Sequence, residues 1–428
     1  MSLQSSTKRF KEKEEAKKLI AVLKEGTSPL TCRIVSIEKK KEKKNPPLLF
    51  NLAELQNECS KRFKISPDET LRIVQELYEK KLVTYPRTDA RVLSTAVSKE
   101  ITKNLNGLSK YQMAAPYMQD ILHYGAYKNL AKTRYVNDKQ ITDHYAIIPT
   151  GQGLSALNSV SATAHHVYDV IVRRFLSIFY PPAVYQKVAL VTQIGKEQFF
   201  SNFRVLAEEG YLKVAGVPAP KKNANGNDAE GDGSDNNVDL DAAFFASIQK
   251  LKKGDILDVK SLDIKEGETS PPKRYNSGSM ILAMENAGQL IEDEELRAQI
   301  KGSGIGTSAT RAEILKKLFN IKYLALNKKT QVITPTLLGE MIYDVVLNSI
   351  RSLLNPELTA SWEKGLNYVA EGEITSDEYM TKLDHFIVSR TNGVLGLNNQ
   401  YQLRSCYDRA AVFYKKETKG RVLKGKKE

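Results

Sequence analysis

The sequence has few cysteines and no long apolar run. Its 428 residues include only three cysteines, Cys32, Cys59 and Cys406, which are too widely spaced for a Cys-x-x-Cys zinc pair or a disulfide framework. No apolar stretch approaches the roughly 20 residues that a membrane-spanning helix needs. The polar N-terminus predicts no signal peptide, and its first residues, Met-Ser-Leu, are typical of an expression leader. These absences favour a protein of a reducing cytoplasm.

The composition is that of a folded, basic protein. Hydrophobic residues make up 41% of the chain and charged residues 27%, which excludes a fully disordered chain and a collagen-like one. The length suggests about three domains. Because 64 Lys and Arg residues outnumber 50 Asp and Glu residues, the net charge is +14, and such a charge points first to a polyanion such as nucleic acid.

The positive charge is concentrated at the two ends of the chain. Residues 1–47 contain 13 Lys and Arg against 6 Asp and Glu, and residues 399–428 contain 9 against 3. The 351 residues between them are almost neutral, with 42 against 41. A specific contact with nucleic acid is therefore expected to depend on local groups and not on the bulk field.

Strand-like and helix-like segments alternate along the chain. Period-two alternation predicts strands at 32–38, 185–214 and near 255–263. Helical spacing and capping residues predict helices over 8–24, 51–62, 66–81, 96–106, 114–123, 163–178 and most of 273–390. We expect an acidic, low-complexity loop at 219–238 and a frayed basic end at 415–427. This order predicts a mostly β unit interrupted by a helical insertion, with further helices after it.

Tyr85 lies at the end of a short extended piece and is followed by Pro86. Because residues i and i+2 of extended backbone face the same side, its phenol and the guanidinium of Arg87 can converge on one phosphate. A phenol ordinarily has a pKa near 10, so as a nucleophile it needs a base or nearby positive charge, and an arginine stabilises a phosphate under attack. On these residues alone, a half-buried core tyrosine is the simpler interpretation, because the chain has 20 tyrosines.

His144 is a second candidate. It is one of five histidines, and its polar neighbours indicate that it is accessible. It can donate a hydrogen bond to a phosphate oxygen, although a surface histidine without a role would have the same pattern.

A glycine-rich stretch at 302–306 is the third candidate. It runs into hydroxyl residues at the start of a helix predicted over 309–319, where backbone N–H groups can bind a phosphate. It is not a Walker A loop, because no Gly-Lys-Ser/Thr follows. A capped helix after a flexible loop is the alternative interpretation.

Taken together and in this order, these stretches resemble the type IA DNA topoisomerases, nearest to the bacterial topoisomerase III branch. The resemblance rests on segments 46–52, 75–89, 144–150, 271–275, 304–313 and 355–363. Each motif alone is only fairly specific, but five or more in family order are highly specific. The resemblance therefore overrides the simpler interpretations of the single residues.

The resemblance implies an α+β multidomain fold. A β-rich gate arch is interrupted by a helical domain of the winged-helix (CAP-like) type that carries the tyrosine, and a mostly helical DNA-binding domain follows. The expected division is a first part of the arch, a tyrosine domain, a second part of the arch, a single-strand-binding domain and a basic tail, at residues 1–47, 48–182, 183–268, 269–390 and 391–428.

The resemblance also implies the catalytic roles. Tyr85 attacks a phosphodiester of DNA and forms a 5′-phosphotyrosine link. Arg87 neutralises the scissile phosphate, His144 contacts phosphate in the same site, and Asp89 orients the neighbouring basic groups. The arch opens as a gate for another strand, and no ATP is needed because the covalent link conserves the energy of the broken bond.

The implied partner is single-stranded or negatively supercoiled DNA, relaxed or decatenated by strand passage. Its contacts are expected at Arg274 and in a turn formed by Thr307, Ser308, Thr310 and Arg311. The resemblance further implies a monomer without membrane contact in the bacterial cytoplasm, associated with the nucleoid.

One part of the family pattern is missing. The family's chain begins with a Toprim domain that carries a catalytic Glu, a Lys and an Asp-x-Asp-x-Glu magnesium site, whereas here the match begins inside the arch. Asp239-Leu240-Asp241 has the spacing but lacks the following Arg-Glu-Gly-Glu. We therefore expect no metal ligand in this chain, with Mg²⁺ bound by the Toprim domain of the full-length enzyme. The fragment alone is expected to bind single-stranded DNA without cleaving it.

Two alternatives stay open. The first is a non-catalytic clamp for single-stranded nucleic acid that naturally lacks a Toprim domain. The second is a tyrosine recombinase or type IB enzyme, which also combines Tyr, Arg and His. Chain order disfavours the second, because there the nucleophile comes last, whereas Tyr85 precedes His144.

Overall fold

The protein folds into two compact units, each formed by several stretches of the chain. The computed structural model describes residues 4–5, 12–25, 29–216, 238–239, 242–264, 266–268, 271–291, 294, 297 and 304–414. Unit 1 comprises residues 1–48, 109–133 and 172–272, and unit 2 comprises residues 49–108, 134–171 and 273–428. The loop expected at 219–238 and the end at 415–427 lie almost entirely outside the described residues.

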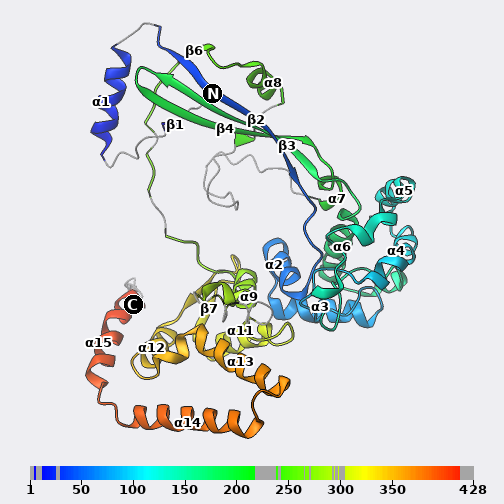
Figure 1. Ribbon diagram of the computed structural model, residues 1–428, viewed down its shortest axis with the longest axis vertical. Helices are drawn as coiled ribbons and strands as arrows, with labels where there is room; N and C mark the ends of the chain where they lie inside the picture. The colour runs from blue at the N-terminus through cyan, green and yellow to red at the C-terminus, as the bar shows by residue number, and fades with distance from the viewer. Residues whose placement is uncertain are drawn as a thin grey trace, which may run out of the picture. The chain divides into compact units, whose positions relative to one another are not determined.

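Unit 1 is built on a largely antiparallel sheet with the strand order β1–β4–β3–β2–β6, and β5 joins β4 in parallel (Figure 1). Its strands are β1 (Gln4–Ser5), β2 (Thr31–Lys44), β3 (Ala183–Ile194), β4 (Glu197–Glu208), β5 (Val238–Asp239) and β6 (Ile256–Asp258). Its helices are α1 (Lys13–Lys24), α5 (Ala115–Tyr124), α7 (Leu212–Ala215) and α8 (Ala242–Lys250).

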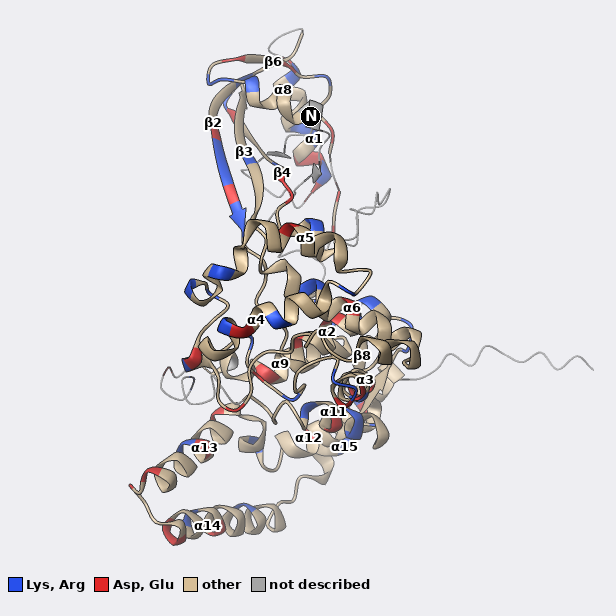
Figure 2. Cartoon of the chain, turned by 90° about the vertical axis from the view of Figure 1, so that its right-hand side faces the viewer, with Lys and Arg blue, Asp and Glu red and all other residues tan. Residues whose placement is uncertain are grey.

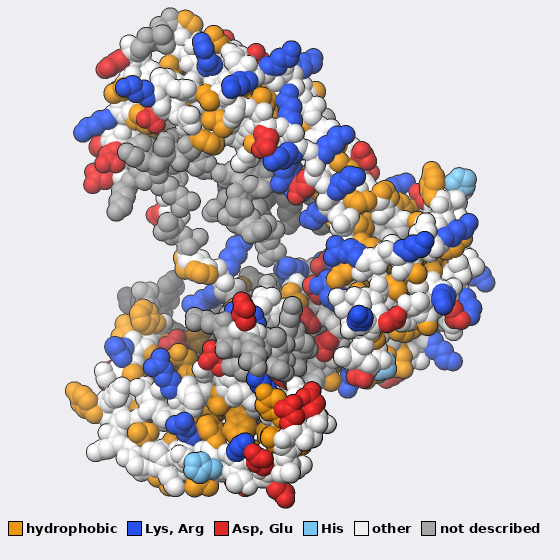
Figure 3. All heavy atoms as spheres, in the orientation of Figure 1, with side chains coloured by type: hydrophobic (Ala, Val, Ile, Leu, Met, Phe, Trp, Pro, Cys, Tyr) orange, Lys and Arg blue, Asp and Glu red, His pale blue; other side chains and the backbone are white. Residues whose placement is uncertain are grey.

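Strand β2 is longer than the sequence pattern predicts. Alternation predicted a strand only over 32–38, but β2 continues through the basic run to Lys44, which pairs with Ala183 of β3. The extension depends on β3, whose apolar alternation supplies a long antiparallel partner. Figure 2 shows the lysines along β2, and Figure 3 shows basic side chains mixed with acidic ones over the sheet.

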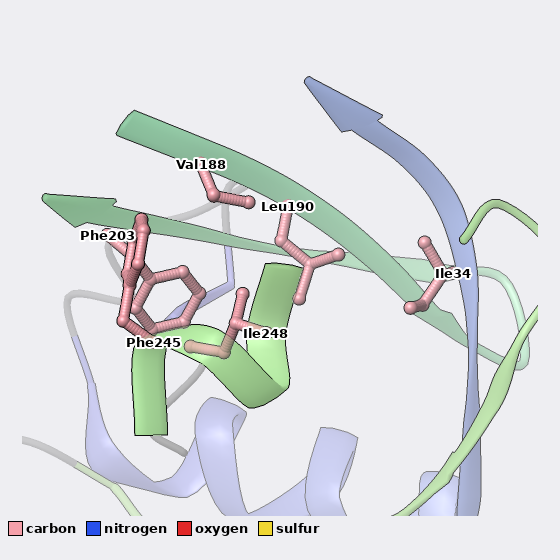
Figure 4. Close-up of a cluster of buried hydrophobic side chains, with 6 residues drawn as sticks. All are labelled: Ile34, Val188, Leu190, Phe203, Phe245 and Ile248. Atoms are coloured by element: carbon pink, nitrogen blue, oxygen red, sulfur yellow. The ribbon is translucent and has the colours of Figure 1, made fainter. Parts of the chain in front are cut away.

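The core of unit 1 lies between the sheet and helix α8. Phe245 and Ile248 of α8 pack against apolar side chains from three strands (Figure 4), namely Ile34, Val188, Leu190 and Phe203. On β2, the ammonium group of Lys39 donates to the carbonyls of Gln249 (2.5 Å) and Leu251 (3.1 Å) at the end of α8. One lysine of the basic run thus holds the end of α8 against the sheet, in addition to being exposed to solvent.

Unit 2 is mainly helical. Its helices are α2 (Leu52–Phe63), α3 (Pro67–Glu79), α4 (Thr95–Leu108), α9 (Ser277–Glu285), α11 (Arg311–Asn320), α12 (Leu337–Leu347), α13 (Pro356–Glu371), α14 (Ser376–Leu395) and α15 (Gln400–Ala411). Helix α6 (Ala162–Ser177) begins in unit 2 and ends in unit 1. None of the helices in the described part of the chain is both long and apolar enough to span a membrane.

The expectation that residues 273–390 are helical apart from a glycine-rich turn misses one hairpin. Strands β7 (Leu324–Leu326) and β8 (Ile333–Pro335) form an antiparallel hairpin. Ile333 of β8 is buried with Leu315 of α11 and Ile281 of α9, so the hairpin closes one side of the core. Three-residue strands are too short for a period-two signal to separate them from a loop.

Capping residues set the helix starts near the catalytic candidates. Ser66 accepts a hydrogen bond from the N–H of Glu69 (3.1 Å) with Pro67 at the first helical position, as the sequence predicted for α3. Asn51 caps α2 by accepting from the N–H of Glu54 (2.9 Å). The starts of both helices are therefore fixed by local sequence.

Helices α2 and α9 pack closely through small residues. A Cβ on Gly278 would lie 2.6 Å from the Cα of Asn57, so only glycine allows this approach. Beside it, the hydroxyls of Ser60 and Ser277 are 2.9 Å apart, and Ser277 also donates to Gln331 (2.9 Å). This contact joins α2 to α9 and to the residues before β8 within unit 2.

Candidate active site

The segment that carries Tyr85 is hydrogen-bonded to the segment that carries His144. The backbone N–H of Thr84 donates to the carbonyl of Ile148 (3.0 Å), and its hydroxyl donates to the carbonyl of Ala146 (3.1 Å) and accepts from the N–H of Ile148 (3.0 Å). The hydroxyl of Thr88, a residue 4% exposed, donates to the carbonyl of His144 (2.7 Å). Two motifs that lie far apart in sequence therefore form one site.

The Tyr85 ring is surrounded by other rings. Its centroid lies 4.3 Å from that of His144 with the planes tilted by 44°, and 5.4 Å from that of Tyr78 in an edge-to-face arrangement at 81°. Such pairs restrict the orientation of the ring. The phenol is thereby held in a defined direction.

A cavity of about 300 Å³ opens beside Tyr85. Its walls come from the end of α3, the Tyr85 segment and the His144 segment, and they are formed by Tyr78, Lys81, Val83, Thr84, Tyr85, His144, Tyr145, Thr150 and Gln152. Burial raises the pKa of the Tyr145 phenol, which therefore stays protonated at neutral pH. No carboxylate is among these lining residues, so the cavity does not repel an anionic ligand.

Arg87 follows Tyr85 by two residues and is exposed. Within the described part of the chain its guanidinium has no acidic partner within salt-bridge distance. Its charge is therefore accessible to a ligand, and its convergence with the Tyr85 phenol on one phosphate stays a prediction.

Lys81 ends helix α3 with a strained backbone. Its φ is +60°, its N–H donates to the carbonyl of Tyr78 (2.8 Å), and the N–H of Leu82 donates to the carbonyl of Leu77 (2.9 Å). This is a Schellman motif, in which glycine is the usual residue at the left-handed position. Lys64 has a similar conformation after α2, with φ of +57°, but it does not line the cavity.

Asp89 and Arg311 form an ion pair. The Nη1 atom of Arg311 lies 2.8 Å from Oδ1 of Asp89 and 4.0 Å from Oε1 of Glu285. Its Nε atom donates to the carbonyl of Ile305 (3.2 Å). The arginine is 1% exposed, so its guanidinium faces inward and joins the Tyr85 segment to the turn before α11.

Asn51 completes this network. Its amide nitrogen donates to the backbone carbonyl of Asp89 (3.1 Å) and to Oε1 of Glu285 (2.6 Å), while its oxygen caps α2. Burial raises the pKa of Glu285, and the charge of Arg311 opposes that shift. Two carboxylates, one arginine and one amide thus bind four separate segments together.

The turn before α11 depends on a glycine. Gly304 has φ of +62°, and a Cβ there would lie 2.5 Å from the carbonyl oxygens of Met284 and Glu285. The exposed hydroxyl residues of the turn are Thr307 and Thr310, whose hydroxyl oxygens lie 3.2 Å apart, whereas Ser308 is half-buried. The helix begins at Arg311 and not at residue 309, because the hydroxyl of Thr310 accepts from the N–H of Thr307 (2.9 Å) in the preceding turn.

Arg274 lies outside this network. It is exposed, and its charge acts on the phenol of Tyr414, where it opposes the rise in pKa that burial and Glu340 cause. The structure therefore joins the segment of Tyr85 and Asp89 to His144 and to Arg311, and it gives Arg274 a different neighbour. For Arg87 it shows only that the side chain is exposed on the Tyr85 segment.

Sequence reasoning missed Glu285 and Tyr78 as parts of the site. Glu285 is the last residue of α9 and resembles an ordinary surface glutamate in the sequence. Tyr78 has the spacing of a core residue on α3, yet it is 38% exposed and lines the cavity. No local sequence signal distinguishes Glu285 from an ordinary surface glutamate or Tyr78 from an ordinary core tyrosine.

The described residues do not provide a fitting site for a magnesium ion. They contain no group of three or more His, Cys, Asp or Glu side chains arranged to hold a metal. The carboxylates of Asp89 and Glu285 both face the guanidinium of Arg311 and so already have a cationic partner. No chemical step is therefore assigned to a metal here.

The chain is similar to known topoisomerases. A family model described as DNA topoisomerase matches residues 2–381. DNA topoisomerase 3 of Bacillus licheniformis is 33% identical over 373 residues, and that of Bacillus subtilis is 34% identical over 347 residues. These alignments cover 86% and 80% of this chain but 48% and 44% of the relatives, so the chain spans about half the length of the curated relatives it matches.

A solved structure has the same fold. Full-length topoisomerase I from Thermotoga maritima matches with a TM-score of 0.61 at 21% identity, covering 90% of this chain and 56% of that chain. All six motif segments that carried the sequence resemblance lie within the residues matched by the family model. The chain belongs to the type IA DNA topoisomerase family.

Proposed function

We propose that this chain carries the nucleophile and the strand-binding surface of a type IA topoisomerase that cleaves and reseals one DNA strand. Tyr85 is the nucleophile, Arg87 and His144 contact the scissile phosphate, and Asp89 holds its segment in place through Arg311. The observation that carries the proposal is the hydrogen-bonded pairing of the Tyr85 and His144 segments beside an open cavity.

The proposed reaction exchanges one phosphoester for another. The phenolic oxygen of Tyr85 attacks the phosphorus and loses its proton to solvent, the bond to the 3′-oxygen breaks, and that oxygen takes up a proton. Arg87 balances the charge that develops on the phosphoryl oxygens. Attack by the 3′-hydroxyl reverses the step, so the number of phosphoester bonds is unchanged and no ATP is required.

The proposed division of labour follows the family resemblance. The exposed groups of Arg274, Thr307 and Thr310, together with the half-buried Ser308, bind the uncleaved part of the strand, and the sheet of unit 1 belongs to the gate. The acidic magnesium site and the acid–base groups belong to a Toprim domain outside these 428 residues. The remaining parts of the proposal are a monomeric state, single-stranded or negatively supercoiled DNA as substrate, and a place in the bacterial cytoplasm at the nucleoid.

A covalent-trapping experiment tests the proposal. A labelled single-stranded oligonucleotide is incubated with the chain, with magnesium, in the presence and absence of an added Toprim domain. We expect binding in both mixtures and a denaturant-resistant adduct only with the Toprim domain. Binding without an adduct in either mixture would favour the non-catalytic clamp, and a 3′-linked adduct would favour the type IB alternative.

A comparison of Lys81 with Lys64 tests whether the positive charge of Lys81 contributes to DNA binding. Lys81→Gly and Lys64→Gly each relieve a left-handed lysine, and each is expected to raise stability by up to about 1 kcal/mol, since the cost of that conformation is partly offset by the entropy of glycine. Only Lys81→Gly is expected to weaken binding to single-stranded DNA. Because one phosphate contact is lost, the slope of the logarithm of the binding constant against the logarithm of the salt concentration should become shallower by about 0.7. Thermal unfolding and salt titrations measure both effects, and equal DNA affinities of the two variants would contradict the prediction.

A further inference from the structure

The cavity beside Tyr85 has a chemistry that the cleavage step does not use. Attack on a phosphate needs the phenol, positive charge and hydrogen-bond donors. The cavity adds two more aromatic walls, Tyr78 and Tyr145, which neither attack nor neutralise the phosphate. Resting on the proposed function, we propose that this cavity receives one unpaired nucleobase of the bound strand, next to the phosphodiester that Tyr85 attacks.

The aromatic walls favour a flat ligand. Tyr78 is 38% exposed, so part of its ring is uncovered, and it stands edge-to-face against Tyr85. Every nucleobase has a π-face, and stacking of bases on protein aromatic rings is the usual way in which unpaired strands are bound. A cavity of about 300 Å³ lies at the lower limit of small-molecule sites, which suits one base better than a larger ligand.

The polar groups that line the cavity are suited to bind a nucleobase that is linked to a phosphate. Lys81 is exposed at the wall and supplies a positive charge for the backbone, while no acidic side chain lines the cavity. Gln152 is exposed and carries an amide that can donate to and accept from a base edge. The hydroxyl of Thr150, by contrast, is engaged by the carbonyl of Lys81 (2.5 Å) and the N–H of Gln152 (3.0 Å) and fixes the wall.

The position of the cavity gives the base a function. Because Tyr78 contacts Tyr85 directly, a base stacked on Tyr78 is held beside the nucleophile and fixes the register of the strand. Unpaired bases can enter such a cavity, whereas bases stacked in a duplex cannot. The cavity therefore makes Tyr78 a positioning residue that favours single-stranded over duplex DNA at the point of cleavage.

The test separates bases from phosphates. Binding of oligo(dT) and of an abasic deoxyribose-phosphate chain of the same length is measured by fluorescence anisotropy with the 428-residue chain. The ratio of the two affinities reports the contribution of the bases alone. Tyr78→Leu is expected to reduce this ratio by about 5- to 150-fold, the usual effect of losing one base–aromatic stack. Tyr78→Phe should retain the ratio, because it keeps the ring. Tyr401 is exposed outside the cavity, so Tyr401→Leu serves as a control that should also retain the ratio.

Photocrosslinking locates the base. An oligo(dT) with one 5-iodouracil is irradiated in the complex, and the crosslinked peptide is expected to contain Tyr78 or Tyr145. An unchanged ratio in Tyr78→Leu, or crosslinks only to other peptides, would overturn the inference while leaving the proposed function intact. Failure of the wild-type chain to bind oligo(dT) at all would overturn the proposed function together with the inference.

Discussion

Replacing Tyr85 with phenylalanine is expected to abolish the covalent protein–DNA adduct completely. The substitution removes only the phenolic oxygen, so the ring contacts with His144 and Tyr78 are kept and the cavity retains its shape. Without that oxygen no phosphotyrosine can form, whatever the other groups contribute. The measurement is the trapping of labelled oligonucleotide by the chain together with an added Toprim domain and magnesium.

Tyr145→Phe provides the matched control for this result. Tyr145 lines the same cavity and is half-buried, and burial raises the pKa of its phenol, which makes it a poor nucleophile. We expect it to form adducts at a level near that of the unsubstituted chain, while Tyr85→Phe still binds the oligonucleotide. An adduct that survives in Tyr85→Phe would show that another residue is the nucleophile.

Arg311→Met is expected to destabilise unit 2 by about 3 kcal/mol, near the low end for removing one partner of a buried ion pair. The guanidinium is almost fully buried, and its loss leaves Glu285 without a nearby positive charge, whereas Asp89, partly exposed, can be solvated. Hydrogen–deuterium exchange of peptides that contain Asp89 and Ile305 measures the loss. Protection there should fall by about 100-fold.

The loss of stability in Arg311→Met is expected to depend on pH because of Glu285. Burial raises its pKa in the folded chain, so its contribution to stability is present at low pH and is lost as the pH rises through that pKa. Removing Arg311 removes the charge that opposes this shift, so the pKa of Glu285 rises further. The deficit is therefore expected to be largest at neutral pH and to shrink as the pH falls toward 4.5, the ordinary value of a glutamate.

Two further variants test the assignment. Glu285→Gln added to Arg311→Met should recover a large part of the stability, because the uncompensated carboxylate is gone. Arg62→Met, which removes an arginine from the more exposed pair with Glu58, should cost less than about 1 kcal/mol. A cost equally small for Arg311→Met would contradict the role given to the network.

The sequence predicted the site where its determinants are local. Ser66 and Pro67 begin α3 as expected, and Arg87 is exposed two residues after Tyr85, while its contact with the same ligand stays a prediction. The convergence of Tyr85 with His144 was predicted only through the family resemblance. The physical cause is the hydroxyl and backbone of Thr84, which need a partner strand that no local pattern reveals.

Arg311 illustrates what the sequence could not predict. In a glycine-rich turn before a helix, an arginine has the pattern of a phosphate ligand, and its expected role in binding the DNA strand stays a prediction. Its inward orientation depends on Asp89 and Glu285, which reach it from two distant segments. The length of β2 was underestimated for the same reason, because a lysine-rich strand is stable only beside its partner β3.

The long pairing of β2 with β3 has a mechanical consequence. From Ser36 to Lys44 the two antiparallel strands pair without a register shift, and irregularities occur only between Ile34 and Ser36 and, toward the other end, between Val184 and Tyr185 where β3 meets β4. A force directed along these strands loads all of their hydrogen bonds in shear at the same time, so they resist together. A register irregularity bends and twists a strand locally, so the regular β2–β3 ribbon is expected to bear such a load as one unit between two local bends.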